Sequence, residues 1–482
     1  MQTGYLPRII RNISEYPNEP YATFISSGIR TEITWGQFGE SCNYFTNRLA
    51  GISKGVVLIF LREMDLMHFS FFGTMMAGHI PSFMPCSSPK QDANMYWSSH
   101  QKLIDHIKPN AIILTHQVKI EMEDSDLDLG GAELIFAEMF EGAISTENFQ
   151  IREKSSDIAL LQHSSGTTGL KKGVALSYES IEKHAISYGD ELQLSERDCI
   201  VSWLPLYHDM GLMACMIVPA YWRVPVVQLD PNEWISDPLQ LFSIIESEVG
   251  TLVWLPNFAF EVLSSLSGYS KRNWDLSCIR ALISCSEVCK YQTLEKFLDS
   301  TKEFNISRKQ LQCCYAMAES VFAVTQTPLG VEIENKHVSV ESLELGGEVL
   351  DCPTGGNGTW VVSSGGVIDG LEIGIYDDCD FIDDKIYEID LFEGYLTLKL
   401  NNAYVPDFNF TDSLLNDYYY LKFSNDSIDG TYVITDANVR YKINRIQPYD
   451  SISINEYPFN FNVIGEKVCV YLDFLKSENC DC

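Results

Sequence analysis

Apolar runs of strand length alternate with segments of helical periodicity between residues 20 and 160. The runs GVVLIFL (55–61) and AIILTH (111–116) are rich in β-branched residues and are bounded by polar positions, as buried parallel strands are. Helix-like patterns lie between them, in WGQFGESCNYFTNRLAG (35–51) and SSHQKLIDHIK (98–108). This alternation predicts βαβ units and a parallel sheet covered by helices.

The same alternation returns between residues 178 and 325 and predicts a second helix-covered sheet. Four runs have the character of buried strands: IVSWLPL (200–206), VPVVQL (224–229), TLVWLP (251–256) and RALISCS (280–286). Two helix patterns accompany them, DPLQLFSIIESEV (237–249) and YQTLEKFLDS (291–300). Two further short runs, IALLQ (158–162) and VALS (174–177), flank a glycine-rich loop.

The pattern changes near residue 330, where alternating strand runs replace the strand–helix rhythm. YLTLKL (395–400) and TYVIT (431–435) are such runs, and GGNG (355–358) and SIDG (427–430) are turn sequences. We therefore expect an α/β chain followed by a β-rich region. The expected domains are 1–176 and 177–330, both α/β, then 331–437, β-rich, and a small domain at 438–482.

Composition and charge narrow the class of function. The chain has 482 residues, 45% of them hydrophobic and 12% aromatic, which is typical of a folded globular protein. It carries 66 acidic and 34 basic residues, a formal net charge of −32. Nucleic-acid binding depends on clustered lysine and arginine, so this balance argues against a nucleic-acid partner.

No membrane span or export signal is expected. The two most apolar stretches, 68–85 and 212–227, are interrupted by proline, histidine or arginine. The first twenty residues show no signal peptide. The 14 cysteines are therefore expected to be reduced in the cytoplasm, and neither Cys313-Cys314 nor Cys480-Asp-Cys482 has the spacing of a zinc site.

The loop SSGTTGLKKG (164–173) is a candidate phosphate cradle. Its glycines allow backbone N–H groups to approach an anion, its hydroxyls add donors, and Lys172 adds a positive charge. The loop does not match the Walker pattern, which requires Gly, four residues and then Gly-Lys-Ser/Thr. On the loop alone, a solvated surface turn is an equal alternative.

Five segments in one order resemble the acyl-adenylate-forming enzymes, which include acyl-CoA synthetases, fatty-acyl-AMP ligases and adenylation domains. They are SSGTTGLKKG (164–173), WLPLYHDMGL (203–212), WLPNFAFEVL (254–263), ISCSEVC (283–289) and CYAMAES (314–320). The segments HDMGL and WLPNFAFEVL, with a weaker match at VVSSGGVIDGLEIGIYD (361–377), are most similar to the fatty-acyl-AMP ligase branch. The resemblance implies a large adenylation domain of two helix-covered sheets plus a β-rich, distorted-barrel subdomain.

The resemblance also implies ATP and Mg²⁺ as cofactors and a carboxylic acid as substrate. By position, the phosphates would contact Ser164, Ser165, Gly166, Thr167, Thr168, Gly169 and Lys172. The adenine would contact Ser284, Cys285, Ser286, Glu287, Tyr315, Ala316 and Met317, and Asn425 or Asp426 would stand at the ribose. The acyl group would contact His208, Trp254, Asn257 and Phe258, and Glu319 would bind Mg²⁺. Lys172, His208 and Glu319 would act in catalysis.

Each of these roles has a structural alternative. Lys172 could be a solvated turn lysine, Glu319 a helix-start carboxylate or ion-pair partner, and Tyr315 a core residue. Asp209, next to His208, could cap the helix that follows it. Aromatic residues such as Trp254 are more often core residues than pocket residues.

The resemblance weakens beyond residue 376. The family's ribose motif is absent, and in TDANVRYKINRIQPYDSI (435–452) Ala437 and Arg440 stand where the family has its hinge residues. Lys476 has no family motif around it, so we expect a solvated tail lysine there. We expect the small C-terminal domain to be largely missing, reduced to one hairpin.

The leading hypothesis is ATP-dependent activation of a fatty or other apolar acid to acyl-AMP with release of pyrophosphate. The acyl group would then pass to a carrier-protein thiol or an amine in a specialised pathway. Two alternatives stay open: an impaired homologue that serves as a nucleotide- or acyl-binding or scaffold subunit, and an acyl-CoA synthetase.

Overall fold

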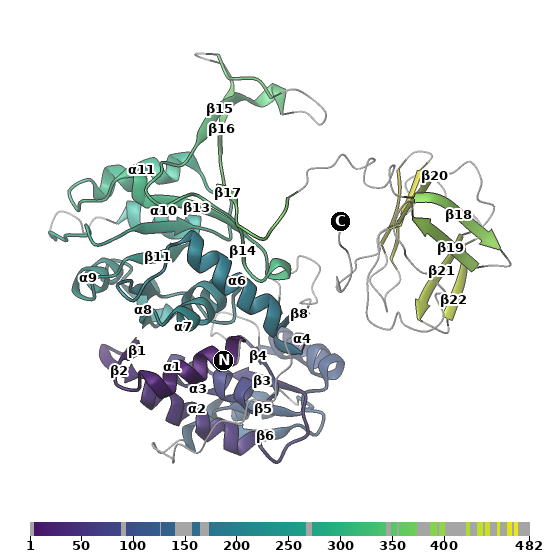
Figure 1. Cartoon of the computed structure of the whole chain (residues 1–482), viewed down its shortest axis with the longest axis horizontal. Coiled ribbons are helices and arrows are strands. Elements are labelled where there is room, and N and C mark those ends of the chain that lie inside the picture. Colours follow the sequence, from purple (N-terminus) through teal and green to yellow (C-terminus); the bar gives the residue numbers. More distant parts are fainter. Residues whose placement is uncertain are drawn as a thin grey trace. The chain divides into compact units, whose positions relative to one another are not determined.

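The computed structural model describes residues 4–87, 93–125, 127–139, 157–163, 173–266, 272–343, 349–353 and 356–373, and beyond them the backbone of the strands β18–β25. The chain divides into two compact units, Met1–Glu372 and Ile373–Cys482. The first unit holds helix-covered sheets and the second is built from strands (Figure 1). The α/β class and the β-rich continuation predicted from the sequence are confirmed.

A four-stranded parallel sheet forms the first part of the N-terminal unit. Its order is β4 (Ile80–Phe83), β3 (Val56–Phe60), β5 (Ala111–Leu114) and β6 (Glu133–Phe136). Chain order reverses between β3 and β5, because the chain goes from β3 to β4 on one side and then to β5 on the other. Crevices at such reversals, beyond the carboxyl ends of the strands, are where α/β sheets bind ligands.

Strands β3 and β5 are apolar at every position because both of their faces are buried. Val57 and Ile59 face the large core of the unit, while the alternate residue Leu58 faces a second core. The same alternation divides Ala111–Leu114 between the two cores.

A nine-stranded sheet forms the larger part of the unit. Its order is β17 (Gly366–Val367), β14 (Ala323–Gln326), β13 (Leu311–Ala316), β12 (Ala281–Ser284), β11 (Leu252–Leu255), β9 (Ile200–Ser202), β10 (Val226–Leu229), β1 (Pro20–Ser26) and β2 (Ile29–Thr34). The six strands from β13 to β1 include only parallel pairs, whereas β2, β14 and β17 are antiparallel at the edges.

Strands β1 and β2 join this sheet although they precede the smaller sheet in the chain. Ala22, from the first predicted α/β segment, pairs with Val226 from the second. In Figure 1 β1 and β2 are purple, whereas the strands that they extend are teal. The two sheets therefore do not separate at residue 176, although both predicted sheets exist; the predicted domain boundaries otherwise stay predictions.

Helices surround both sheets. They are α1 (Tyr5–Glu15), α2 (Trp35–Leu49), α3 (Met64–Met76), α4 (Ala93–Ile107), α5 (His116–Glu123), α6 (Tyr178–Glu191), the π-helix η2 (Met210–Ile217), α7 (Val218–Trp222), α8 (Pro231–Ser236), α9 (Gln240–Ser247), α10 (Asn257–Ser265) and α11 (Tyr291–Thr301). Short 3-10 turns are η1 (Ala137–Met139), η4 (Arg308–Gln310), η5 (Ala318–Ser320) and η6 (Val340–Ser342). A hairpin of β7 (Ile158–His163) and β8 (Gly173–Ser177) flanks the glycine-rich loop.

The β-rich region begins with a hairpin of β15 (Asn335–Ser339) and β16 (Gly358–Val362). In the second unit β18 (Ile386–Phe392) pairs with β19 (Tyr395–Leu400), and β21 (Thr431–Asp436) pairs with β22 (Val439–Ile443). A four-stranded sheet has the order β20 (Leu421–Ser424), β25 (Lys467–Val470), β24 (Asn460–Ile464) and β23 (Ser451–Ser453). Four of the described strands, β22 to β25, lie beyond residue 437 in place of the single predicted hairpin, and β25 pairs with β20 from before that boundary.

In the part of the chain that the structure describes, every helix is too short or too polar to cross a membrane. The apolar stretch 68–85 forms most of α3 and β4, and 212–227 forms parts of η2, α7 and β10.

Candidate active site

Four of the five segments singled out in the sequence follow parallel neighbouring strands of the nine-stranded sheet. The chain passes from β9 to His208, from β11 to Asn257, from β12 to Ser286 and from β13 to Glu319. Because β9, β11, β12 and β13 are parallel, these segments all leave the same edge of the sheet. This edge is where an α/β sheet positions a ligand.

Hydrogen bonds join three of these segments. The backbone N–H of Phe258 donates to Glu287 Oε2 at 2.9 Å, and the N–H of Lys290 donates to Asn257 Oδ1 at 3.0 Å. Ser286 Oγ lies 3.8 Å from Met210 Sδ, in the segment after β9. The structure therefore brings together residues that are separated by up to 76 positions in the chain.

A strained turn follows β12. Ser284 and Cys285 are buried, and Ser286 then adopts a φ of 66°, in the left-handed region that favours glycine. Ser286 and Glu287 are exposed beyond this turn. Non-glycine residues in this conformation cost about 1–3 kcal/mol and concentrate at binding and catalytic sites.

The segment after β13 presents an aromatic ring and a carboxylate. Tyr315 is 50% exposed although it belongs to a central strand, and its predicted alternative as a core residue is not what the structure shows. Ala316 is half-buried, and a hydrogen bond of 2.9 Å from Met317 N–H to Phe322 O closes the turn that carries Glu319. Glu319 is exposed and has no ion pair with any residue that the structure describes.

The glycine-rich loop is anchored close to this carboxylate. His163 at the end of β7 pairs with Gly173 at the start of β8, so the loop connects the two strands of one hairpin. The turn η5, which carries Glu319, contacts β8. Residues 164–172, including Lys172, lie outside the described residues, as do Asn425 and Asp426.

His208 stands at the start of the π-helix η2, with its imidazole 47% exposed. Its Nδ1 lies 2.6 Å from Asp209 Oδ1, which also accepts from Met210 N–H at 2.8 Å. The predicted cap at Asp209 is therefore confirmed. Gly211 is required here, because a Cβ would lie 2.3 Å from the carbonyl oxygen of Pro205.

The predicted acyl-site residues occupy different environments. Trp254 is 1% exposed, and its Nε1–H donates to Tyr188 Oη at 2.9 Å, so it packs in the sheet core. Asn257 is buried and holds the 285–290 loop through Lys290. Phe258 is 43% exposed. Contact of these three residues with an acyl group stays a prediction.

Sequence reasoning missed an aromatic cluster beside Phe258. The rings of Trp203 and Trp234 stack in parallel, with centroids 3.7 Å apart, and the ring of Phe258 meets each edge-on at 6.2 Å. Trp203 lies in the His208 segment, but Trp234 comes from α8, which carried no motif. The stacking of Trp234 on Trp203 is therefore visible only in the structure.

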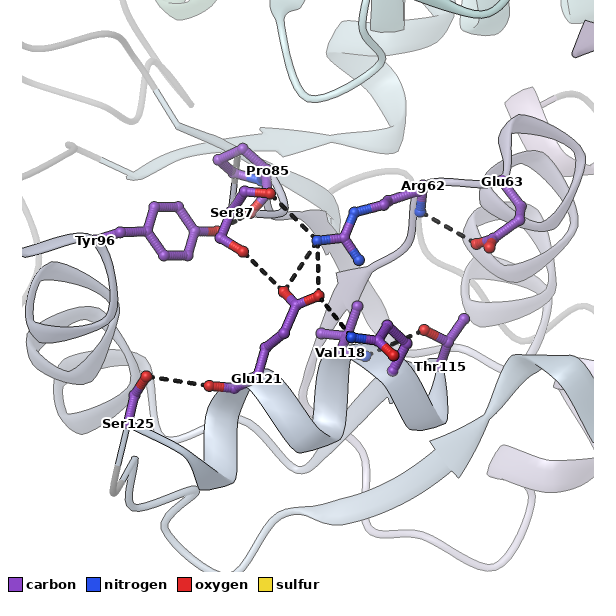
Figure 2. Close-up of polar contacts among 10 residues, drawn as sticks. Arg62, Glu63, Pro85, Ser87, Tyr96, Thr115, Val118, Glu121 and Ser125 are labelled. Atoms are coloured by element: carbon purple, nitrogen blue, oxygen red, sulfur yellow. Dashed lines mark hydrogen bonds and ion pairs between the residues drawn. The ribbon is translucent and has the colours of Figure 1, made fainter. Parts of the chain in front are cut away.

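A second polar cluster lies at the carboxyl edge of the four-stranded sheet, at the reversal between β3 and β5 (Figure 2). Arg62 Nη2 donates to both carboxylate oxygens of Glu121, at 2.9 and 3.1 Å, and to Ser87 O at 3.2 Å. Ser87 Oγ donates to Glu121 Oε2 at 2.7 Å. Burial raises the pKa of Glu121, but these hydrogen bonds outweigh it and the pKa is lowered. The charges compensate each other, so this cluster fastens α5 to two loops.

Comparison with known proteins assigns the chain to one family. A model of the family described as "AMP-binding enzyme" matches residues 10–362. The chain belongs to the AMP-binding enzyme family. The match includes all five segments recognised in the sequence, so the predicted family is confirmed.

Relatives of this AMP-binding enzyme include acyl-activating proteins by name. It is 26% identical over 310 residues to a putative acyl-CoA synthetase of Caulobacter vibrioides, covering 64% of this chain and 53% of that protein. It is 24% identical over 382 residues to the long-chain-fatty-acid–AMP ligase FadD26 of Mycobacterium marinum, covering 75% of this chain and 64% of that ligase. The chain thus spans less than two thirds of the length of either relative.

Solved structures share the fold of this AMP-binding enzyme. A fatty acyl-adenylate ligase from L. pneumophila, solved with acyl adenylate and pyrophosphate, has a TM-score of 0.68 at 23% identity, covering 76% of this chain and 64% of that chain. A fatty acid AMP ligase from Legionella pneumophila has a TM-score of 0.70 at 20% identity, covering 98% and 76%. The roles of individual site residues stay predictions.

Proposed function

We propose that this AMP-binding enzyme joins ATP and an apolar carboxylic acid as acyl-AMP and releases pyrophosphate. The observation that carries the proposal is the meeting of four segments at one sheet edge. The half-exposed Tyr315 lies there, and so does the carboxylate of Glu319, which has no ion pair among the described residues and lies beside the base of the glycine-rich loop. The names of the relatives and the match of the family model support the same reaction.

The reaction needs positioning more than it needs a protein nucleophile. An oxygen of the substrate carboxylate attacks the α-phosphorus of ATP, and pyrophosphate leaves from the opposite side. The chain contributes by holding both substrates in line and by compensating charge on the phosphates. The loop of residues 164–172 would hold the β- and γ-phosphates through backbone N–H groups, hydroxyls and Lys172.

The adenine would lie between the turn after β12 and the ring of Tyr315. The ring of Tyr315 is half-exposed although it belongs to a central strand, so one of its faces is open for stacking on a base. The turn at Ser286 would place backbone groups of 284–287 along the edge of the base. Asp426 would stand at the ribose.

Glu319 fits a divalent cation. Carboxylate oxygens are the ligands that Mg²⁺ prefers, and this carboxylate is exposed with no positive partner in the described parts of the chain. When bound, Mg²⁺ supplies positive charge to the phosphate oxygens. His208 and Phe258 would lie at the acyl group, with Trp203 and Trp234 supporting Phe258.

Pyrophosphate exchange tests the proposal. The full chain is incubated with ATP, Mg²⁺, labelled pyrophosphate and a panel of aliphatic and aromatic acids. We expect label in ATP with at least one acid, a loss of about 10²–10³-fold in rate for Glu319→Gln and Lys172→Ala, and no loss for Glu303→Gln, a matched exposed carboxylate outside the site. Absence of exchange with every acid would overturn the proposed activity.

The acceptor is a separate part of the proposal. We infer a carrier-protein thiol or an amine, in a cytoplasmic pathway, from the similarity to the fatty-acyl-AMP ligase branch. Rapid formation of acyl-CoA by the purified chain would instead favour an acyl-CoA synthetase. Binding of an acyl-AMP mimic without exchange would favour an impaired nucleotide- and acyl-binding subunit.

A further inference from the structure

Two stacked tryptophans carry hydrogen-bond donors that no described residue uses. The Nε1–H groups of Trp203 and Trp234 are shielded from solvent and have no partner among the residues that the structure describes. Trp203 is 5% exposed and Trp234 is 3% exposed. An indole N–H can only donate, and a buried donor without an acceptor is costly, so the great majority are paired in folded proteins. We therefore expect an acceptor from outside the described residues to reach this pair.

Other buried tryptophans differ from this pair in their partners or in their place. The indole N–H groups of Trp254 and Trp274 donate to side-chain hydroxyl oxygens at 2.9 and 3.0 Å. Trp35 also lacks a partner among the described residues. It follows Thr34, however, which pairs with Pro20 at the start of β1, so it lies at the opposite edge of the sheet from the candidate site.

The two unpaired tryptophans come from neighbouring strands at the edge that holds the candidate active site. Trp203 directly follows β9, and Trp234 lies in α8, which follows β10. Strands β9 and β10 are parallel neighbours, with Ser202 beside Gln228. Phe258 lies in α10, which follows β11 on the other side of β9. Three adjacent parallel strands therefore each lead to one aromatic ring at the carboxyl edge of the sheet.

The three rings form one group that extends from the core to the surface. The indoles stack with centroids 3.7 Å apart and planes 3° from parallel, and the ring of Phe258 meets each edge-on at 6.2 Å. Phe258 is 43% exposed, and its backbone N–H bonds to Glu287 in the turn predicted to contact adenine. Because both indole nitrogens are shielded, an acceptor reaches them only after a side chain moves. We assign that movement to Phe258, the exposed member of the group.

We propose that the Trp203–Trp234 pair is a specificity subsite that donates hydrogen bonds to a keto or hydroxyl oxygen on the hydrocarbon tail of the acid. The preferred substrates are then oxygenated fatty acids, and unsubstituted fatty acids are poorer substrates. This inference rests on the proposed function, because it requires the acyl group to lie beside Phe258. The indoles select the tail, and they take no part in the attack of the carboxylate on ATP.

The selection arises from the difference between a paired and an unpaired donor. An unsubstituted tail covers the indole N–H groups with hydrocarbon, whereas an oxygen on the tail accepts from them. A site that hydrogen-bonds a substrate group rejects the analogue without that group more strongly than an apolar pocket separates tails of different length. The apolar faces of the rings suit the rest of the tail. We expect a preference of about 10–100-fold for the oxygenated acid.

Pyrophosphate exchange with matched acids tests the subsite. The full chain is assayed with decanoic acid and with hydroxy- and oxodecanoic acids in which the oxygen is moved along the tail. We expect at least one oxygenated acid to exceed decanoic acid by about 10–100-fold in kcat/KM. This ratio should fall toward one in Trp203→Phe/Trp234→Phe, which keeps two aromatic rings and removes both N–H groups. The matched control Trp35→Phe removes an unpaired N–H at the opposite edge and should keep the ratio. A ratio that the folded double variant shares with wild type would overturn the inference.

Calorimetry with the same free acids, without ATP, separates the subsite from the reaction. We expect the wild-type chain to bind an oxygenated acid more tightly than decanoic acid, so the subsite is tested even if the double variant fails to fold. Exchange with decanoic acid together with equal binding of all the acids would overturn the subsite and leave the proposed function standing. Selective binding of an oxygenated acid without exchange would overturn the proposed function and leave the subsite standing. Absence of both binding and exchange would overturn both.

Discussion

Replacing Tyr188 with phenylalanine removes one buried hydroxyl by which α6 bonds to side chains of the nine-stranded sheet. That hydroxyl accepts from Trp254 Nε1–H at 2.9 Å and donates to Gln326 Oε1 at 3.2 Å. All three side chains are at most 1% exposed, so water cannot replace the missing partner. Burial raises the pKa of Tyr188 well above its ordinary value, so the hydroxyl remains a donor across the range of stability measurements.

The expected loss follows from the two groups left unpaired. A buried donor or acceptor without a partner costs about 1–3 kcal/mol, so two such groups should lower the free energy of unfolding by ~2–6 kcal/mol. The matched control is Tyr221→Phe, whose hydroxyl lies 3.5 Å from Glu182 at a partly exposed position. We expect the control to lose less than about 0.5 kcal/mol.

Urea denaturation followed by circular dichroism measures both variants. Combining Tyr188→Phe with Trp254→Phe completes a double-mutant cycle, in which we expect a coupling energy of about 1 kcal/mol. A loss for Tyr188→Phe no larger than that of Tyr221→Phe would refute the reasoning. So would the absence of coupling with Trp254, because the shared hydrogen bond is the stated cause.

Three further predictions concern the site and its supports. Ser286→Gly should stabilise the chain by about 0.5–1 kcal/mol in thermal unfolding, because glycine adopts a positive φ without strain. Ser286→Val should destabilise it, and equal melting temperatures for the two variants would contradict the argument. Gly211→Ala should lower the free energy of unfolding by about 1–3 kcal/mol, because the new Cβ would lie 2.3 Å from a backbone carbonyl oxygen. Gly51→Ala should be tolerated, because the space around Gly51 is open. Equal losses for the two glycines would contradict the steric argument. Arg62→Met should lower the free energy of unfolding by up to about 1 kcal/mol at neutral pH. The folded-state pKa of Glu121 is lowered, so the stabilisation by the Arg62–Glu121 pair is complete above the unfolded pKa of about 4.3 and disappears as the pH falls through the folded value. A difference in free energy of unfolding between wild type and Arg62→Met that widens in acid would refute this prediction.

Local pattern was sufficient for most of the elements. The predicted runs at 55–61, 111–116 and 251–256 match β3, β5 and β11 to within about two residues at each end, as expected for boundaries. Each strand is buried on both faces, and this environment requires a continuous apolar run that is visible without the structure. Motifs with fixed spacing likewise pointed to the correct family.

Long-range pairing was not visible in the same way. The addition of β1 to β10, the β20 sheet of the second unit and the stacking of Trp234 on Trp203 all join residues without a shared motif. Backbone hydrogen bonds in a sheet depend little on side-chain identity, so many partners for an edge strand are equally compatible with its residues.

By itself the sequence of this AMP-binding enzyme determined its strands and helices, its family and the residue types at the edge of the sheet. Hydrophobic period and motif spacing act between near neighbours in the chain, and they can be read there. Only the tertiary structure decided that Arg62 is neutralised by Glu121 and that Tyr315 remains exposed. Those outcomes depend on distances between segments far apart in the chain, which packing sets once the sheets have formed.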